Sequence, residues 1–378
     1  LGVAAIARAA AGLRVEAEGE PVEYAVKMVR LPRDGMLDER LARDRFGRAD
    51  LQRLATLMAR FHASAATGPH IDRHGSREAI EANWRENFDQ VPQHASELIS
   101  GFVECQLARD VWRRRVETGR IRDCHGDLRS ESVYLGEDGR LEVLDCIEFN
   151  DRFRYGDVAS EVAFLANDLD WRGRPDLAWS WVQDYVSESG DAELEDVLPF
   201  YKCYRAFVRG KVESMAAQER EVPQPERREH QQAAQEHFRL AELYATEVSP
   251  VLIMAGGQVG SGKSTLAHGV ASLLGIASHS SDACRKELAG IAATERGGPG
   301  MYSNGMTSRA YTALARRGQA VLEQGKAVVL DATYGNARKR AQAVKAAQRA
   351  GVPYVFLEAS TPDALIRQRL RSRTTDKA

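Results

Sequence analysis

The stretch "GGQVGSGKST", Gly256–Thr265, follows a short apolar run and leads into a helical pattern that begins at Lys263. It has the spacing Gly-x-x-x-x-Gly-Lys-Ser of a phosphate-binding loop, formed by Gly257, Gly262, Lys263 and Ser264. Glycines let backbone N–H groups surround phosphate oxygens, the lysine neutralises β and γ phosphate charge, and the serine offers an oxygen to Mg²⁺. We therefore predict that this loop binds ATP with Mg²⁺. The predicted nucleotide-binding residues are Gly257, Gln258, Val259, Gly260, Ser261, Gly262, Lys263, Ser264 and Thr265.

Strand and helix patterns alternate from this loop to the end of the chain. Apolar runs at 251–257, 327–333 and 353–359 are each followed by a helical pattern, starting at Lys263, after Asn336 and at Pro362. This order predicts an α/β domain with a parallel sheet and crossover helices. We place this domain at residues 249–378, because a charged helical pattern ends near Glu247.

The segment "SHSSDACRKELAG", residues 278–290, contains an acidic and a basic residue that suit an acceptor site. Asp282 and Arg285 lie three residues apart, on the expected first turn of a helix after a short strand. A carboxylate there can take the proton of a hydroxyl group, and a guanidinium can hold a phosphate. The spacing alone fits a capping aspartate followed by an exposed arginine equally well.

The segments "GGQVGSGKST", "SDACRKELAG" and "VVLDATYGNARKR" together resemble the small P-loop kinases grouped with zeta toxins, gluconate kinase, chloramphenicol phosphotransferase and the kinase part of polynucleotide kinases. The resemblance covers most of residues 250–375. It implies that Asp282 is the general base and that Arg285 holds the acceptor or a phosphate. It also implies that Asp331 is the Walker B acid, which holds Mg²⁺ through water.

The last helical pattern carries four arginines where such kinases have lid arginines, and Arg369 is the one we assign to the nucleotide. For any one of the four, a solvated basic helix face is an equally good interpretation. The four are Arg367, Arg369, Arg371 and Arg373. Because the chain stops at "RTTDKA", we expect the lid to be incomplete.

A second phosphate-handling pattern, "HGDL" at residues 125–128, lies far upstream of the P-loop. Asp127 is followed by Asp145 in "RLEVLDCIEFN", residues 140–150, which we predict to be a strand. Two carboxylates on loops that flank a short hairpin can converge, with Asp127 orienting a hydroxyl group and Asp145 binding Mg²⁺.

Together with "LDCIEFNDRFRYGDVASEVAFL", this pattern resembles the aminoglycoside phosphotransferase family, which has a protein-kinase-like fold, over about residues 20–215. The resemblance gives Asp127 the catalytic position, Asp145 the metal position, Asp157 a bracing role and Pro32 the hinge between two lobes. The whole chain is similar to proteins described as bifunctional aminoglycoside phosphotransferase/ATP-binding proteins. We accordingly expect an α+β kinase-like domain at residues 1–248, with a mostly helical C-terminal lobe.

Three departures weaken the kinase-like site. Ser132 stands where the family usually has a metal-binding asparagine. Lys27 precedes Pro32 by only five residues, which leaves no room for the helix that carries a glutamate partner. No Gly-rich loop precedes Lys27, so we expect a fragmentary N-terminal lobe without the cationic clamp that phosphoryl transfer needs.

Charge and composition set wider limits. The chain has 378 residues and a net charge of −2, with 18 Lys+Arg against 8 Asp+Glu from residue 249 onward. A basic C-terminal part suits an anionic ligand or exposed basic helix faces. Apolar runs are too short to cross a membrane and no signal peptide opens the chain, so we expect a cytoplasmic protein. The five scattered cysteines predict free thiols.

Three hypotheses for function remain open on the sequence. The first is an ATP-dependent kinase that phosphorylates a hydroxyl group of a small molecule such as a sugar or an aminoglycoside. The second is a pseudokinase module that binds a ligand, fused to an NTPase switch that has no acceptor. The third is a 5′-hydroxyl nucleic-acid kinase, which is disfavoured because no platform of interleaved aromatic and basic residues is present. The acceptor and the oligomeric state cannot be read from the sequence.

Overall fold

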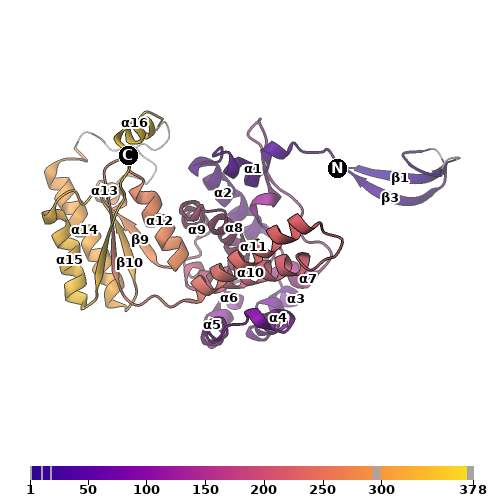
Figure 1. Cartoon of the computed structure of the whole chain (residues 1–378), viewed down its shortest axis with the longest axis horizontal. Helices are drawn as coiled ribbons and strands as arrows, with labels where there is room; N and C mark the ends of the chain where they lie inside the picture. The colour runs from indigo at the N-terminus through magenta and orange to yellow at the C-terminus, as the bar shows by residue number, and fades with distance from the viewer. Residues whose placement is uncertain (1, 10–11, 18, 293–297, 299, 373–378) are drawn as a thin grey trace.

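The computed structural model describes residues 2–9, 12–17, 19–292, 298 and 300–372. Three parts follow one another along the chain (Figure 1). The N-terminal sheet (residues 2–27) extends away from the body, the helical part (residues 33–245) forms the middle, and the P-loop part (residues 252–372) lies at the other end. None of the helices in these described ranges is long and apolar enough to cross a membrane.

The N-terminal sheet has three antiparallel strands, in the order β2-β1-β3. They are β1 (Gly2–Ala9), β2 (Gly12–Val15) and β3 (Pro21–Lys27). Gly12, the first residue of β2, has φ of +117°. Most side chains of this sheet are exposed, and Lys27 pairs with Glu16 at 2.8 Å on its surface.

The helical part is built around α8, in which every residue from Val158 to Asp170 is buried. Helix α8 spans Val158–Trp171. The other helices of this part are α1 (Leu37–Ala42), α2 (Arg48–Ser64), α3 (Pro69–Asp72), α4 (Arg77–Gln90), α5 (Glu97–Leu107), α6 (Val111–Glu117), α7 (Asp151–Arg154), α9 (Pro175–Ser189), α10 (Leu194–Ala216) and α11 (Gln224–Ala245). One hydrophobic core runs through this part from Leu37 to Ala245. This part is therefore mostly helical, as expected.

Short elements connect the helices of this part. Four 3₁₀ turns are η1 (Arg33–Gly35), η2 (Arg73–Gly75), η3 (Pro92–His94) and η4 (Ser130–Ser132). Two small antiparallel sheets pair β4 (Ile121–Asp123) with β7 (Tyr155–Asp157), and β5 (Val133–Leu135) with β6 (Leu141–Val143). The strand predicted at 140–150 is thus only three residues long, since Asp145 adopts φ of +62° and the chain leaves the sheet.

The P-loop part has a four-stranded sheet in the order β11-β8-β10-β9, and every neighbouring pair is parallel, as predicted. Its strands are β8 (Leu252–Gly256), β9 (Ala277–Ser280), β10 (Val328–Asp331) and β11 (Tyr354–Glu358). Its helices are α12 (Lys263–Leu274), α13 (Ser281–Leu288), α14 (Asn304–Glu323), α15 (Ala337–Ala350) and α16 (Asp363–Ser372). The sequence analysis did not predict α14.

The helix that follows the P-loop, α12, packs directly on the helical part. The His268 ring stacks on Trp179 of α9 with ring centroids 3.9 Å apart, and Gly269 faces Pro175. The buried Lys202 of α10 donates to the backbone oxygen of Ser272 at 2.8 Å. The helix that follows the P-loop motif is therefore anchored on the helical part.

Candidate nucleotide and phosphotransfer site

The loop between β8 and α12 has a shape that only glycine permits at its ends. Gly257 has φ of +147°, and a Cβ there would lie 2.5 Å from Ser261 Oγ and 2.8 Å from the Ala359 oxygen. Gly262, which caps α12, has φ of +88°. These are left-handed conformations that other residues rarely adopt. The loop thus bends tightly and delivers the chain into the first turn of α12 at Lys263.

The loop lies where an anion is favoured. All four strands are parallel, so their carboxyl ends share one edge of the sheet, and the N-terminus of α12 opens there with its unpaired N–H groups. Thr361 Oγ1 donates to the Ser261 backbone oxygen at 2.8 Å, which fastens the loop to the segment after β11. The Ser261 side chain is buried, and its Oγ has no hydrogen-bond partner among the described residues. A polar atom of that kind is suited to a ligand oxygen.

The structure brings together Ser264 and Asp331, the two residues of this part that were predicted to hold Mg²⁺. Ser264 Oγ donates to Asp331 Oδ2 at 2.6 Å, and the other carboxylate oxygen, Oδ1, is buried without a hydrogen-bond partner in the described part of the chain. Burial raises the pKa of Asp331 above its ordinary value, against the opposing effects of Ser264 and Lys263. A hydroxyl and a carboxylate oxygen beside a phosphate loop are donors that Mg²⁺ accepts. The residues present therefore fit the ion.

Asp282 and Arg285 lie on α13, directly after the neighbouring strand β9. In the sheet register Asp331 faces Ser280, which caps α13 by accepting from the Ala283 N–H at 3.0 Å. The structure thus brings Asp282 to the same edge as Asp331. Asp282 Oδ1 accepts from Arg285 Nη1 at 3.2 Å, and the side chain of Asp282 is one third exposed. An incoming hydroxyl group can reach this carboxylate from solvent.

Arg369 of α16 reaches the P-loop from the other side. Its Nη1 lies 3.5 Å from the Gly260 oxygen, and a Cβ on Gly262 would lie 3.4 Å from the same nitrogen. Arg367 and Arg371 are exposed on α16, whereas Arg373 lies outside the described residues. Of the predicted lid arginines in the described range, Arg369 is thus the one that contacts the loop.

The "HGDL" segment is organised differently from the expectation. Asp127 accepts from Arg129 Nε at 2.9 Å and from Nη2 at 3.0 Å, so a guanidinium fork covers its carboxylate. Burial opposes ionisation of Asp127, but the hydrogen bonds and charge of Arg129 outweigh it and hold the pKa below its ordinary value. Ser132 Oγ donates to the backbone oxygens of Asp127 and Arg129. Its hydroxyl group is therefore committed within the loop.

Asp145 is exposed, and no hydrogen bond or ion pair joins it to Asp127 in the part of the chain that the structure describes. The metal role of Asp145 stays a prediction. Asp157, in contrast, is built in as a brace: it caps α8 by accepting from the Ala159 N–H at 2.8 Å, and Arg115 donates to both its oxygens. Its burial fits the role that the family resemblance implies.

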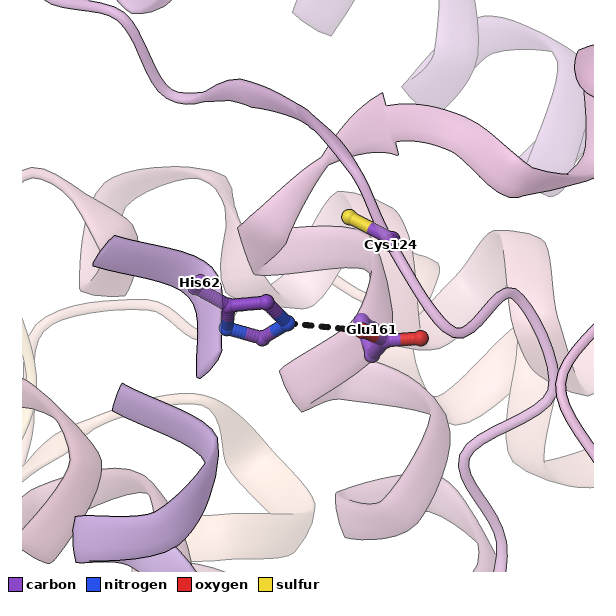
Figure 2. Close-up of side chains that lie close together, drawn as sticks. All are labelled: His62, Cys124 and Glu161. Atoms are coloured by element: carbon purple, nitrogen blue, oxygen red, sulfur yellow. Dashed lines mark hydrogen bonds and ion pairs between the residues drawn. The ribbon is translucent and has the colours of Figure 1, made fainter. Parts of the chain in front are cut away.

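A buried cluster that the sequence analysis missed holds this loop in place (Figure 2). Glu161 accepts from the backbone N–H of His125 at 3.1 Å, from that of Gly126 at 2.6 Å and from His62 Nε2 at 2.6 Å. His62 Nδ1 bonds to the Tyr185 hydroxyl at 2.7 Å. His62, Cys124 and Glu161 lie close enough for a metal ion. Both His62 nitrogens are already engaged, however, and burial raises the pKa of the Cys124 thiol, so we interpret the cluster as structural.

Comparison with known proteins agrees with the geometry of the C-terminal site. The family model described as an AAA domain matches residues 252–378. The C-terminal part is a P-loop kinase-like domain. It is the part that carries the Ser264–Asp331 pair.

Three mycobacterial proteins, all described as uncharacterised, are similar over most of the chain. Two are from strains of Mycobacterium tuberculosis and one is from Mycobacterium bovis. Each is 35% identical over 306 residues, which is 77% of this chain and 60% of the relative. The chain thus spans about 60% of the length of these relatives.

Proposed function

We propose that the chain is an ATP-dependent phosphotransferase that acts on a hydroxyl group of a small molecule, with its chemistry at the P-loop part. One observation carries the proposal: Ser264 and Asp331 meet at 2.6 Å at the carboxyl edge of a parallel sheet, and Asp282 follows the next strand. A phosphate loop, a metal-binding pair and a partly exposed carboxylate at one edge are the parts that in-line phosphoryl transfer requires.

Each residue has a defined task in this proposal. The P-loop N–H groups and Lys263 bind the β and γ phosphates, and Ser264 with Asp331 holds Mg²⁺, which neutralises phosphate charge when bound. Asp282 accepts the proton of the acceptor hydroxyl group, whose oxygen forms a bond to the γ phosphorus as the bond to the bridging oxygen breaks and ADP leaves. Arg369 compensates the charge that develops on the transferring group.

Arg285 has two functions in the proposed site. Before the acceptor binds, its Nη1 hydrogen bond orients Asp282, and its guanidinium lies 4.9 Å from the centre of the Tyr302 ring. The Arg285 side chain is only 10% exposed, so this orientation is well fixed. When the acceptor arrives, its hydroxyl group competes with Arg285 for Asp282, and the guanidinium becomes available to a substrate oxygen.

A second proposal concerns the helical part, and the Arg129 fork on Asp127 favours it. A carboxylate that is held by two guanidinium hydrogen bonds is a poor base for a hydroxyl group. We propose that the helical part binds a ligand without transferring phosphate to it.

A screen of hydroxyl-bearing metabolites for ATP-dependent phosphorylation tests the proposal. Asp282→Asn should lower the turnover number by about 10²–10⁴-fold, because the general base is lost. Lys263→Ala should abolish transfer, whereas Asp127→Ala should leave it unchanged. Phosphate release that needs no acceptor and survives Asp282→Asn would instead support an NTPase switch. Transfer that is lost only in Asp127→Ala would place the chemistry in the helical part.

A further inference from the structure

The helical part contains a cavity of about 290 Å³ beside the "HGDL" loop. It is enclosed by α4, α7, α8 and α10, and Gly126 and Asp127 form part of its wall. The volume is near the lower limit of small-molecule sites, so it suits a ligand of few atoms. Nothing in the proposed reaction of the P-loop part uses this cavity.

Every carboxylate in the wall of this cavity already has a cationic or histidine partner. Three of the four pairs are largely buried, so the partner's effect on the carboxylate is weakly screened by water. The pairs are Glu86 with Arg152 at 2.5 Å, Asp127 with Arg129 at 2.9 Å, Asp157 with Arg115 at 2.6 Å and Glu161 with His62 at 2.6 Å. The wall therefore offers no unmatched negative charge to a cationic ligand.

Two cations of the wall contact only neutral oxygens in the described part of the chain. Lys211 Nζ donates to Asn87 Oδ1 at 2.6 Å and to Gln90 Oε1 at 2.7 Å. Arg205 Nε donates to the Ser160 hydroxyl and carbonyl oxygens at 3.1 and 3.2 Å, and its guanidinium lies 4.4 Å from the centre of the Phe164 ring. Burial lowers the pKa of Lys211, and the nearby charge of Glu86 only partly opposes this effect.

The two other arginines in the wall do not alter this balance. Arg209 pairs with Glu213, and Arg154 pairs with Asp123 at 2.7 Å; neither carboxylate lies in the wall. The wall thus carries an excess of positive charge centred on Arg205 and Lys211, both on α10. Six residues of helix separate them by roughly 9 Å, a span that two long side chains can bridge toward one ligand.

From this charge balance we propose that the cavity binds a small metabolite through an anionic group, a phosphate or a carboxylate, held by Arg205 and Lys211. A carboxylate or phosphate oxygen forms charge-assisted hydrogen bonds with both cations, which neutral oxygens cannot match. Asn83 and Asn87 of α4 supply amide groups for hydroxyl groups of the same ligand. A polycationic aminoglycoside is disfavoured, because it would meet two unmatched positive charges.

Calorimetric titration of the full chain carrying Lys263→Ala tests this site, because that variant removes phosphate binding at the P-loop. The probes are glucose 6-phosphate, ribose 5-phosphate and gluconate, with glucose and kanamycin as neutral and cationic comparisons. We expect at least one anionic probe to bind with one molecule per chain, and glucose and kanamycin to bind at least tenfold more weakly. Sugar phosphates and gluconate separate the phosphate from the carboxylate source.

Lys211→Gln should weaken binding of the anionic probe by about tenfold or more, since one hydrogen bond from a charged donor is lost. Arg85→Gln is the matched control: Arg85 also lies on the surface of this region, pairs with Glu81 at 2.7 Å and is outside the cavity wall. It should leave binding unchanged. Because Arg205 packs on Phe164, Arg205→Lys is used in place of a neutral variant, and thermal unfolding checks that each variant folds.

Three outcomes would overturn the proposal. The first is that none of the anionic probes saturates a site in the Lys263→Ala chain. The second is that kanamycin binds as tightly as the best anionic probe. The third is that Lys211→Gln, shown to be folded, binds as tightly as Arg85→Gln. The comparison of charged and neutral probes on the Lys263→Ala chain decides the matter even if both cavity variants fail to fold. It is independent of catalysis, so loss of the proposed phosphotransfer would not affect it.

Discussion

Replacing Lys202 with methionine tests how the P-loop part is attached to the helical part. Lys202 Nζ lies 2.5 Å from Asp170 Oδ2 and donates to the Ser272 oxygen of α12 at 2.8 Å. The ammonium group also lies 4.3 Å from the centre of the Tyr244 ring. Lys202 is 2% exposed and Asp170 is 6% exposed, so water cannot solvate either charge.

The magnitude follows from what the substitution leaves behind. In Lys202→Met, Asp170 keeps two neutral donors, the Tyr244 hydroxyl at 2.7 Å and the Ser272 hydroxyl at 2.9 Å, but loses its cation. Removing one partner of a buried ion pair destabilises a protein by about 3–5 kcal/mol. A loss of about 4 kcal/mol changes the ratio of folded to unfolded chain by roughly 10³. Adding Asp170→Leu should recover a large share of the loss, because no buried charge then remains unpaired.

Urea unfolding, followed by tryptophan fluorescence, measures these losses. The chain offers a matched control in Lys326, which pairs across the same two parts with Asp196 at 4.0 Å but is 65% exposed. Lys326→Met should lower the free energy of unfolding by less than about 1 kcal/mol. Equal losses for Lys202→Met and Lys326→Met would refute the reasoning, since burial of the pair would then be without consequence.

Three further predictions concern single buried groups. Asp331→Asn should abolish transfer and yet stabilise the nucleotide-free chain by about 0.5–2 kcal/mol at pH 7. Because the pKa of Asp331 is raised, burial of its carboxyl group lowers the free energy of unfolding only while the group is ionised. The gain in thermal midpoint that Asp331→Asn produces should therefore vanish toward pH 4. A gain that persists at pH 4 would contradict this explanation. Arg115→Met should lower the free energy of unfolding in urea by about 3–5 kcal/mol, because Asp157 and Asp191 lose their buried cation; a loss below about 1 kcal/mol would be inconsistent with that burial. Burial lowers the pKa of His237 to about 3, so below pH 6.5 this imidazole gains a proton in the unfolded state but not in the folded state. The free energy of unfolding should therefore fall by about 1.3 kcal/mol between pH 7 and pH 5.5. An equal pH dependence in His237→Gln would argue against this assignment to His237.

The features of the P-loop part that were predicted correctly depend on residues close together in sequence. The glycine spacing defines the loop, and the alternation of apolar runs with helical patterns defines the parallel sheet. Asp331 could be placed because it ends an apolar strand, and Asp282 because it opens a helix after the neighbouring one. Helix α14 was missed although its buried residues recur at helical spacing.

The features that were missed depend on contacts between distant residues. Arg129 follows Asp127 by two residues, but nothing in their spacing shows that the guanidinium folds back over the carboxylate. Glu161 is a charged residue within an apolar helix, which is a signal of a buried partner, yet His62 is 99 residues away. The cavity beside the "HGDL" loop likewise joins α4 to α10, and Lys211 contacts Asn87 across 124 residues. Such pairings are set by packing of the whole helical part, which periodicity does not encode.

Calorimetric titration of the chain with MgATP tests the central claim most directly. The account predicts one nucleotide per chain, no binding in Lys263→Ala, and unchanged binding in Asp127→Ala. Nucleotide binding that survives Lys263→Ala, or that is lost in Asp127→Ala, would contradict the assignment of the nucleotide to the loop at residues 257–265.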